Sequence, residues 1–310
     1  MRAVITEDYG SAPTVTEVPT PTAGPGQIRV KVRASSLNGF DNALTRGFFK
    51  GMMEHRFPIV LGKDFAGTVD QVGDGVTGFA VGDDVFGVVM TFPLNEGGFG
   101  EYVVLPEGPN VAPIPAGLDH ATAGVIGLAG AAATNSIDAL APKPGETVLI
   151  SGATGGVGAI AIQLAAARGA TVIATAAPGT ETEHVRSLGA THVVDYTGDV
   201  PSQVRAIAPD GVDAALHAAG DPFALADLLA PGGRLATLLG QGQEAFGERP
   251  ITVTSIFATP VRPLLETLAG EIAGGRMRMP VSRTYALDEV PQAFNDFANG
   301  TLGKLAVRVS

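Results

Sequence analysis

The sequence predicts an α/β protein that combines a β-rich domain with a doubly wound parallel sheet. The chain has 310 residues, which is more than most single domains contain. Between residues 148 and 240, short apolar strands alternate with helical segments, as parallel strands joined by crossover helices require. The first third of the chain instead carries short valine-rich runs separated by Gly, Pro and Asp, a pattern typical of strands joined by turns.

The β-rich part opens the chain, and its strands are expected to form a barrel or a sandwich. In QIRVKVRA (27–34), apolar residues alternate with basic ones, which predicts a strand with one buried face and one solvent face. The end of the chain offers helices at 262–275 and 288–300, and strands at 281–287 and 304–309. We expect this last segment to return to the first domain.

Composition and charge exclude several classes of protein. The hydrophobic fraction of 45% is ample for packed cores, and the net charge of −11 argues against a nucleic-acid or membrane partner. Without cysteine there are no disulfides and no thiolate metal sites. The first residues lack a secretion signal, so we expect a cytoplasmic protein. The uncharged stretch 121–137 is rich in Ala and Gly, and is expected to be a packed helix.

A strand-to-helix turn in VLISGATGGVG (148–158) carries four glycines within seven residues. Glycine lets a ligand approach the main chain, and the N-terminus of the following helix offers unpaired N–H groups to an anion. On the first strand of a doubly wound sheet, such a turn predicts a dinucleotide pyrophosphate site, although Ala153 replaces the first glycine of G-x-G-x-x-G. The alternative is a turn that serves packing only. The expected contacts are Gly152, Ala153, Thr154, Gly155, Gly156, Val157 and Gly158.

At this point the sequence resembles the zinc-independent medium-chain dehydrogenases/reductases of the quinone oxidoreductase type. The matching pieces follow the family's order: PGQIRVKVRASSLNGFD, FPIVLGKDFAGTVDQVGDGVTGFAVGDDVFG, GGFGEYVV, SGATGGVG, LAPGGRLATLLG and GKLAVRV. The resemblance implies a split catalytic domain of GroES-like β structure and a Rossmann domain. We place the catalytic domain at 1–118 and 257–310, and the Rossmann domain at 119–256.

The same resemblance argues against a metal. Zinc-dependent relatives carry a cysteine and a histidine as ligands at positions that here resemble Asn38 and Lys63. The structural-zinc loop has no counterpart, and the five histidines lie far apart in the chain. We therefore expect no zinc.

Without a Lewis acid, hydrogen bonds must polarise the carbonyl of an acceptor. Asn38 is the first candidate to contact the nicotinamide or the carbonyl, and its alternative role is to close a turn after a strand. Lys63 is a candidate for stabilising an anionic intermediate, with a solvated surface lysine as the alternative. Asp41 completes the catalytic candidates, although an orienting role is preferred for Asp41 and Asp64.

Cofactor choice depends on the end of the second strand of the sheet. An acidic residue that grips the NAD ribose is missing after Ala174, which favours NADPH over NADH. Glu181 and Glu183 oppose a second phosphate unless Arg186 turns inward. The further cofactor contacts that we expect are Thr175, Arg186, Ala218, Leu239 and Lys304, with Asn38 at the nicotinamide.

We therefore expect an NADPH-dependent reductase of quinones or α,β-unsaturated carbonyl compounds (enones). The alternative is a dinucleotide-binding sensor or scaffold with little turnover, which the unusual phosphate loop would allow. The apolar, β-branched strands RLATLLG (234–240) and ITVTSI (251–256) leave an edge that a second subunit can cover, so a homodimer is expected.

Overall fold

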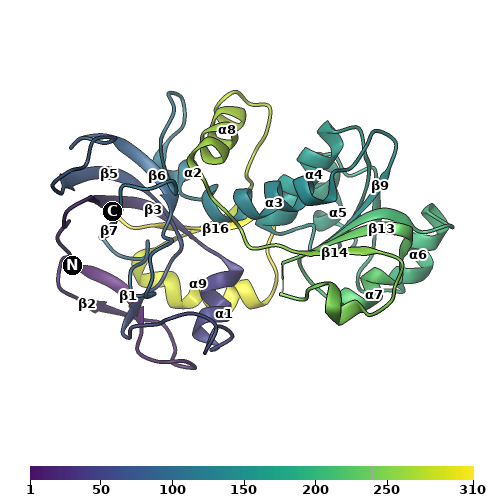
Figure 1. Ribbon diagram of the computed structural model, residues 1–310, viewed down its shortest axis with the longest axis horizontal. Helices are drawn as coiled ribbons and strands as arrows, with labels where there is room; N and C mark the ends of the chain where they lie inside the picture. Colours follow the sequence, from purple (N-terminus) through teal and green to yellow (C-terminus); the bar gives the residue numbers. More distant parts are fainter. Residues whose placement is uncertain (239) are drawn as a thin grey trace. The chain divides into compact units, whose positions relative to one another are not determined.

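The computed structural model describes residues 1–238 and 240–310 and divides into two compact units (Figure 1). Unit 1 comprises Met1–Ala129 and Pro260–Ser310, and unit 2 comprises Gly130–Thr259. The end of the chain therefore folds with its beginning. The expected fold class is confirmed, with a β-rich unit and a doubly wound parallel sheet.

Unit 1 is built from a seven-stranded and a three-stranded sheet. The larger sheet has the order β15-β16-β3-β5-β6-β8, with β7 also on β3, and the smaller has the order β2-β1-β4. Its strands are β1 (Arg2–Thr6), β2 (Thr14–Glu17), β3 (Gln27–Leu37), β4 (Ile59–Val60), β5 (Asp64–Val72), β6 (Asp84–Val88), β7 (Tyr102–Pro106), β8 (Val111–Pro113), β15 (Val281–Ala286) and β16 (Lys304–Arg308). Its helices are α1 (Gly39–Thr45), α2 (His120–Ala123), α8 (Arg262–Ala273) and α9 (Val290–Ala298).

Strand β3 changes character along its length. Ile28, Val30 and Val32 are fully buried, and the basic residues between them face outward, as the alternation predicts. The alternation ends at residues 34–37, which are all buried, so both faces of the strand are covered there. This part of β3 places two serines inside the protein, and α1 begins just after it.

Unit 2 is a sheet of six parallel strands with helices on both sides (Figure 1). The order β11-β10-β9-β12-β13-β14 puts β9 at the centre, where the direction of strand addition reverses, and ligands of such sheets bind at the carboxyl ends of the strands there. The elements are α3 (Gly127–Leu140, which begins in unit 1), β9 (Thr147–Ser151), α4 (Gly156–Ala167), β10 (Thr171–Thr175), α5 (Thr180–Ser187), β11 (His192–Val194), α6 (Val200–Ile207), β12 (Val212–His217), α7 (Pro222–Ala226), β13 (Leu229–Thr237) and β14 (Thr252–Ser255).

Strand β13 and the uncharged stretch 121–137 differ in how they match the sequence-based expectations. Strand β13 begins at Leu229 rather than at residue 234, because Leu229 pairs with Val212 on β12 and the pairing then shifts register. The uncharged stretch 121–137 contributes to α2 and to the packed helix α3. Among the described residues, no helix is both long and apolar enough to cross a membrane.

A glycine on β5 provides a test of how tightly β3 and β5 pack. A methyl group on Gly67 would lie 2.1 Å from the Lys31 carbonyl oxygen, whereas one on Gly270 in α8 would meet no atom within 4 Å. We expect Gly67→Ala to lower the free energy of unfolding by about 1–3 kcal/mol through overpacking. The control Gly270→Ala should raise it by roughly 0.5–1 kcal/mol. Urea unfolding measures both, and equal stability of the two variants would contradict this account of the β3–β5 pairing.

Candidate active site

The candidate active site in unit 1 is organised around the buried carboxylate of Asp64, the first residue of β5. Asp64 is fully buried. Its Oδ2 accepts hydrogen bonds from Ser36 Oγ at 2.5 Å and from Asn38 Nδ2 at 2.8 Å. Its Oδ1 accepts one from the backbone N–H of Leu128 at 2.7 Å. Three hydrogen bonds from two separate parts of the chain, the end of β3 and the start of α3, therefore converge on one carboxylate.

Lys304, the first residue of β16, provides the positive charge of this cluster. Its Nζ lies 3.4 Å from Asp64 Oδ2 and donates to the Leu37 carbonyl at 2.9 Å and to Asn38 Oδ1. Burial lowers the pKa of Lys304, and the neighbouring carboxylates oppose that shift. All three hydrogens of its ammonium have an acceptor, so Lys304 is saturated inside the cluster.

Asn38 is saturated as well. Its Nδ2 donates to Asp64 and to the Ser36 carbonyl at 3.2 Å, and its Oδ1 accepts from Lys304. The backbone N–H of Asn38 donates to Asp41 Oδ2 at 2.9 Å, so Asn38 also closes the turn between β3 and α1. Its amide therefore has no hydrogen left for a further acceptor.

Asp41 lies in the first turn of α1 and is fully buried. Besides Asn38, it accepts a hydrogen bond from the backbone N–H of Gly62 at 3.1 Å. Burial raises the pKa of Asp41 to about 6, while the hydrogen bond from Asn38 lowers it. Asp41 thus ties α1 to the segment that leads into β5.

Lys63 precedes β5, and its side chain is 5% exposed. Its Nζ lies 4.9 Å from the centroid of the Phe40 ring, a cation–π contact. Burial lowers the pKa of Lys63 to about 8, against the attraction of Asp41 and Asp64. The alternative of a solvated surface lysine does not describe this buried side chain.

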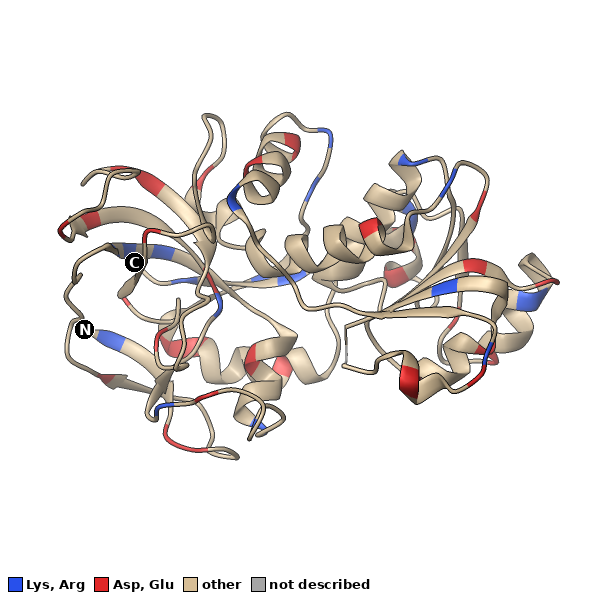
Figure 2. Cartoon of the chain, viewed as in Figure 1, with Lys and Arg blue, Asp and Glu red and all other residues tan. Residues whose placement is uncertain are grey.

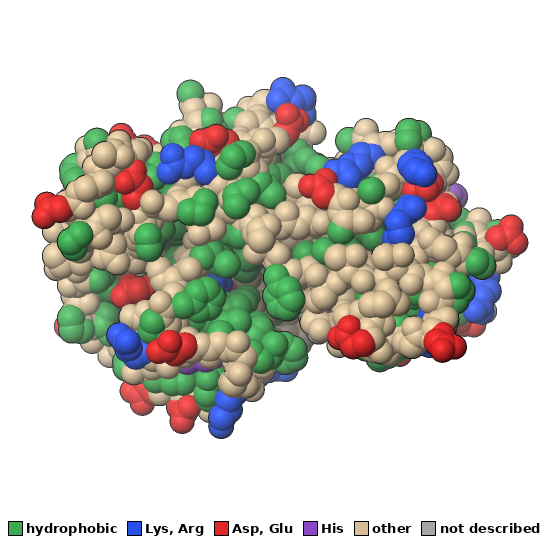
Figure 3. All heavy atoms as spheres, in the orientation of Figure 1, with side chains coloured by type: hydrophobic (Ala, Val, Ile, Leu, Met, Phe, Trp, Pro, Cys, Tyr) green, Lys and Arg blue, Asp and Glu red, His purple; other side chains and the backbone are tan. Residues whose placement is uncertain are grey.

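Aromatic side chains continue outward from Phe40. Phe40 stacks on Phe49 at a centroid distance of 4.5 Å, and Phe49 meets Phe48 edge-to-face at 5.3 Å. Phe48 is 55% exposed and Met52 is 58% exposed. We call Phe40, Phe48, Phe49 and Met52 the aromatic patch; hydrophobic side chains gather at the surface around α1 in Figure 3.

The structure thus brings together the three catalytic candidates, Asn38, Asp41 and Lys63, with Asp64 and Lys304, and adds Ser36, which the sequence analysis did not assign. Lys304, expected as a cofactor contact, lies in the same cluster. Ser36 and the central place of Asp64 were missed. The signal for Ser36 was the pair of serines that ends an otherwise valine-rich strand.

The glycine turn in unit 2 has the geometry that a pyrophosphate site needs. Gly152 has φ +72°, and a Cβ there would meet Ala218 and Ala219 at 3.1–3.2 Å. A Cβ on Gly158 would lie 2.5 Å from Ala153 Cα, so the first turn of α4 packs directly on the loop. Gly155 caps α4, whose first N–H groups have no partner within the helix. This cradle fits a dinucleotide.

The residues expected to contact the cofactor ribose lie at the end of β10 and on α5. Thr175 is buried, and its Oγ1 accepts from the Gly152 N–H at 3.2 Å, so it braces the turn. Glu181 accepts from the Ala177 N–H at 2.8 Å and from the Tyr196 hydroxyl at 3.0 Å. Arg186 is exposed on α5. The expected contact at Leu239 lies outside the described residues.

His217, which the sequence did not single out, ends β12 beside the turn. It is fully buried, with Nδ1 3.1 Å from Thr237 Oγ1 and Nε2 3.0 Å from the Gly220 carbonyl. Burial lowers its pKa, which favours the neutral imidazole. Next to it, Ser151 Oγ donates to the Ala219 carbonyl, and Ala218 donates its backbone N–H to Ser151 at 3.3 Å.

The residues at the zinc-ligand positions do not fit a zinc ion. The Asn38 amide is engaged by Asp64 and Lys304, and Lys63 presents an ammonium, which cannot bind a cation while it is protonated. Within the described part of the chain, no three His, Asp or Glu side chains are grouped to hold a metal.

Acidic and basic side chains are interspersed along the chain in Figure 2.

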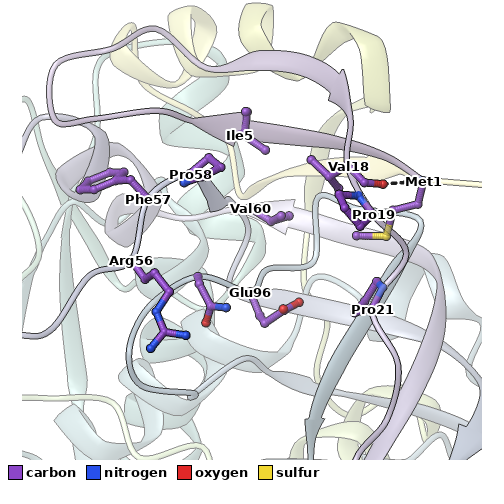
Figure 4. A pocket seen from close by; sticks show the side chains of 11 residues that line it. Met1, Ile5, Val18, Pro19, Pro21, Arg56, Phe57, Pro58, Val60 and Glu96 are labelled. Carbon is purple, nitrogen blue, oxygen red and sulfur yellow. Dashed lines mark hydrogen bonds between the residues drawn. The ribbon is translucent and has the colours of Figure 1, made fainter.

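A separate hollow of about 250 Å³ lies in unit 1 and shares no residue with the Asp64 cluster (Figure 4). Apolar side chains such as Ile5, Val18 and Val60 line it, with Arg56 and Glu96 beside them. The Met1 ammonium closes one side by donating to the Val18 carbonyl at 2.8 Å. Burial raises the pKa of Glu96. This hollow offers none of the hydrogen-bond network found around Asp64.

Family models of known proteins match each of the two units. Residues 24–116 match the alcohol dehydrogenase GroES-like domain, and residues 156–259 match the zinc-binding dehydrogenase family. The quinone oxidoreductase of Coxiella burnetii superposes with a TM-score of 0.90 at 26% identity, covering 100% of this chain and 99% of that one. That of Pseudomonas syringae pv. Tomato DC3000 gives 0.88 at 26% identity, with 99% of each chain covered.

The curated relatives resemble this chain over only part of their own length. The phthioceranic/hydroxyphthioceranic acid synthase of Mycobacterium tuberculosis is 34% identical over 92% of this chain, but the chain spans only 14% of that protein. Dehydrogenase azaJ of Aspergillus niger is 41% identical over 59% of this chain and 56% of its own. The chain belongs to the medium-chain dehydrogenases/reductases and fits their quinone oxidoreductase type.

Proposed function

We propose that this oxidoreductase uses NADPH to reduce a quinone or an α,β-unsaturated carbonyl compound, and that it works without zinc. The observation that carries the proposal is the chemistry at the two zinc-ligand positions. Lys63 provides an N–H group there that no described residue accepts, beside an Asn38 held in a buried network, and an N–H group polarises a carbonyl where a metal is lacking. The quinone oxidoreductases among the structural relatives support this class of acceptor.

The roles of the chain follow from the two sites. The turn at 152–158 would hold the pyrophosphate, and the nicotinamide, when bound, supplies the hydride. Asp64 and Lys304 hold Asn38 and its neighbours in fixed positions, and Asp41 fixes α1. Beside this fixed network, the Lys63 ammonium is the donor that stabilises the charge developing on an acceptor oxygen.

Support for NADPH comes from the end of β10, where Thr175, Ala176 and Ala177 provide no acid to bind a ribose diol. The Glu181 carboxylate opposes a second phosphate, but it is already engaged by Ala177 and Tyr196. With one good quinone or enone acceptor, kcat/KM should favour NADPH over NADH by tenfold or more, about 1.4 kcal/mol.

The assay that tests this function follows the loss of reduced-cofactor absorbance with a panel of quinones and enones. A parallel reaction contains a chelator, and turnover should be unchanged there. No turnover with any acceptor would contradict the reductase, and would favour a sensor or scaffold. Equal or better use of NADH would withdraw the NADPH assignment, and loss of activity in chelator would withdraw the zinc-free mechanism.

The turn itself has a direct test. In Gly158→Val, the new side chain would collide with Ala153 and with the Gly152 carbonyl, each 2.5 Å from the Cβ position, and would push α4 away from the loop. We expect NADPH affinity, measured by cofactor fluorescence, to fall at least tenfold, whereas Gly270→Ala should bind normally. A folded Gly158→Val protein with unchanged affinity would remove the pyrophosphate assignment.

We also propose that the protein is a homodimer. Strand β14 pairs with β13 and, within the described residues, with no other strand, so it forms an edge of the sheet in unit 2. Phe257, just beyond this strand, is 69% exposed. Light scattering at micromolar concentration should give the mass of two chains, and a monomeric mass would count against the dimer.

A further inference from the structure

Lys304 and Lys63 both lie near Asp64, and they differ in the number of hydrogen-bond acceptors around their ammonium groups. The Lys304 ammonium has three acceptors and is saturated. Lys63 is 5% exposed; its ammonium lies 4.9 Å from the centroid of the Phe40 ring, donates no hydrogen bond to any described residue, and keeps contact with solvent. A lysine whose side chain is mostly buried, but whose ammonium is open to solvent and has no protein acceptor, marks a place for an incoming ligand.

The neighbours of Lys63 define what that ligand can be. The Asn38 amide is fully used within the cluster, so Lys63 is the N–H donor that remains for an incoming oxygen. The aromatic patch begins at Phe40, which touches Lys63, and reaches the exposed Phe48 and Met52. A flat, apolar acceptor that ends in a carbonyl oxygen matches both features, because the patch binds its body and the ammonium binds its oxygen.

We propose that Lys63 is the catalytic acid of the reduction, donating a proton to the carbonyl oxygen of a flat apolar enone or quinone that packs on the aromatic patch. This inference rests on the proposed function and assigns a group to its proton transfer. Asn38, Asp41, Asp64 and Lys304 are then positioning residues that keep the surrounding backbone and charges in place.

For an enone, the bonds, electrons and proton of this step all balance. Hydride addition forms a C–H bond at the β-carbon, the C=C electron pair shifts, and the carbonyl oxygen becomes an enolate. An N–H bond of Lys63 breaks, and its proton bonds to that oxygen to give the enol, which becomes the ketone in water. The nicotinamide is oxidised by two electrons, the acceptor is reduced by two, and the Lys63 amine regains a proton from solvent.

The electrostatic surroundings suit this task. The carboxylates that act on Lys63 are Asp41 on α1 and Asp64 on β5, and Lys304 on β16 is paired with Asp64. Burial nevertheless lowers the pKa of Lys63 to about 8, so the ammonium is protonated at neutral pH and gives up its proton more readily than an exposed lysine. A step that needs the ammonium should weaken as pH rises through about 8.

The test uses a phenolate as a stable analogue of the enolate, so that it does not depend on turnover. The full chain is titrated at neutral pH with 4-nitrophenol, and absorbance reports the bound phenolate. We expect Lys63→Met to lower affinity at least tenfold, Lys63→Arg to restore part of it, and Phe40→Leu to keep a pH-dependent phenolate signal. In the wild-type protein, binding should decline as pH rises through about 8.

Kinetics supply the second readout. Lys63→Met should lower kcat by about 100-fold or more, the usual contribution of a general acid, with NADPH affinity unchanged. Wild-type phenolate affinity and kcat in a Lys63→Met protein that binds NADPH normally would overturn the proposal. If the wild-type protein reduces no acceptor yet binds phenolate through Lys63, the oxygen site stands and the reductase function fails. If Lys63→Met does not fold, Lys63→Arg and Lys63→Gln are measured in the same way.

Discussion

The buried carboxylate of Asp64 is the interaction on which the candidate active site depends. It receives hydrogen bonds from Ser36 on β3, from Asn38 just after β3 and from the backbone at the start of α3, and it faces the ammonium of Lys304 on β16. Removing one partner of such a buried pair costs about 3–5 kcal/mol, because the other charge stays buried and uncompensated. That magnitude is about as large as the cost of truncating a large core side chain, so the pair helps to fix these elements relative to one another within unit 1.

This arrangement supports the proposed zinc-free mechanism. The buried Asp64 carboxylate holds Asn38 and Lys304 by hydrogen bonds, and Lys63 lies in the field of the two buried carboxylates, Asp41 and Asp64. Lys304 neutralises the anion, and Asn38 links the two. Lys63, stabilised by Phe40 and by the field of Asp41 and Asp64, is the positive charge left available.

Much of this was accessible from sequence, because it follows from local patterns. Alternation in residues 27–34 predicts β3, and the glycines at 152–158 predict the turn, since each depends only on neighbours in the chain. The Asp64 cluster was less accessible. Lys304 lies 240 residues from Asp64 and Ser36 lies 28 residues away, and no local rule shows which of several polar residues a distant strand will bring together. For the same reason, the sequence could not show that every hydrogen of the Asn38 amide is already donated, or that the Lys63 ammonium has no acceptor. Both follow from the hydrogen-bond geometry of the structure.

The central claim is that Lys63 is a mostly buried, protonated acid with no protein acceptor for its ammonium, and its own titration tests this most directly. Nuclear magnetic resonance of lysine side chains, with the Lys63 signal assigned by its absence in Lys63→Met, measures the pKa of that one group. The account predicts a midpoint near 8, shifting upward when a phenolate binds because the anion favours the ammonium. A midpoint near the ordinary 10.5 that does not respond to phenolate would contradict it.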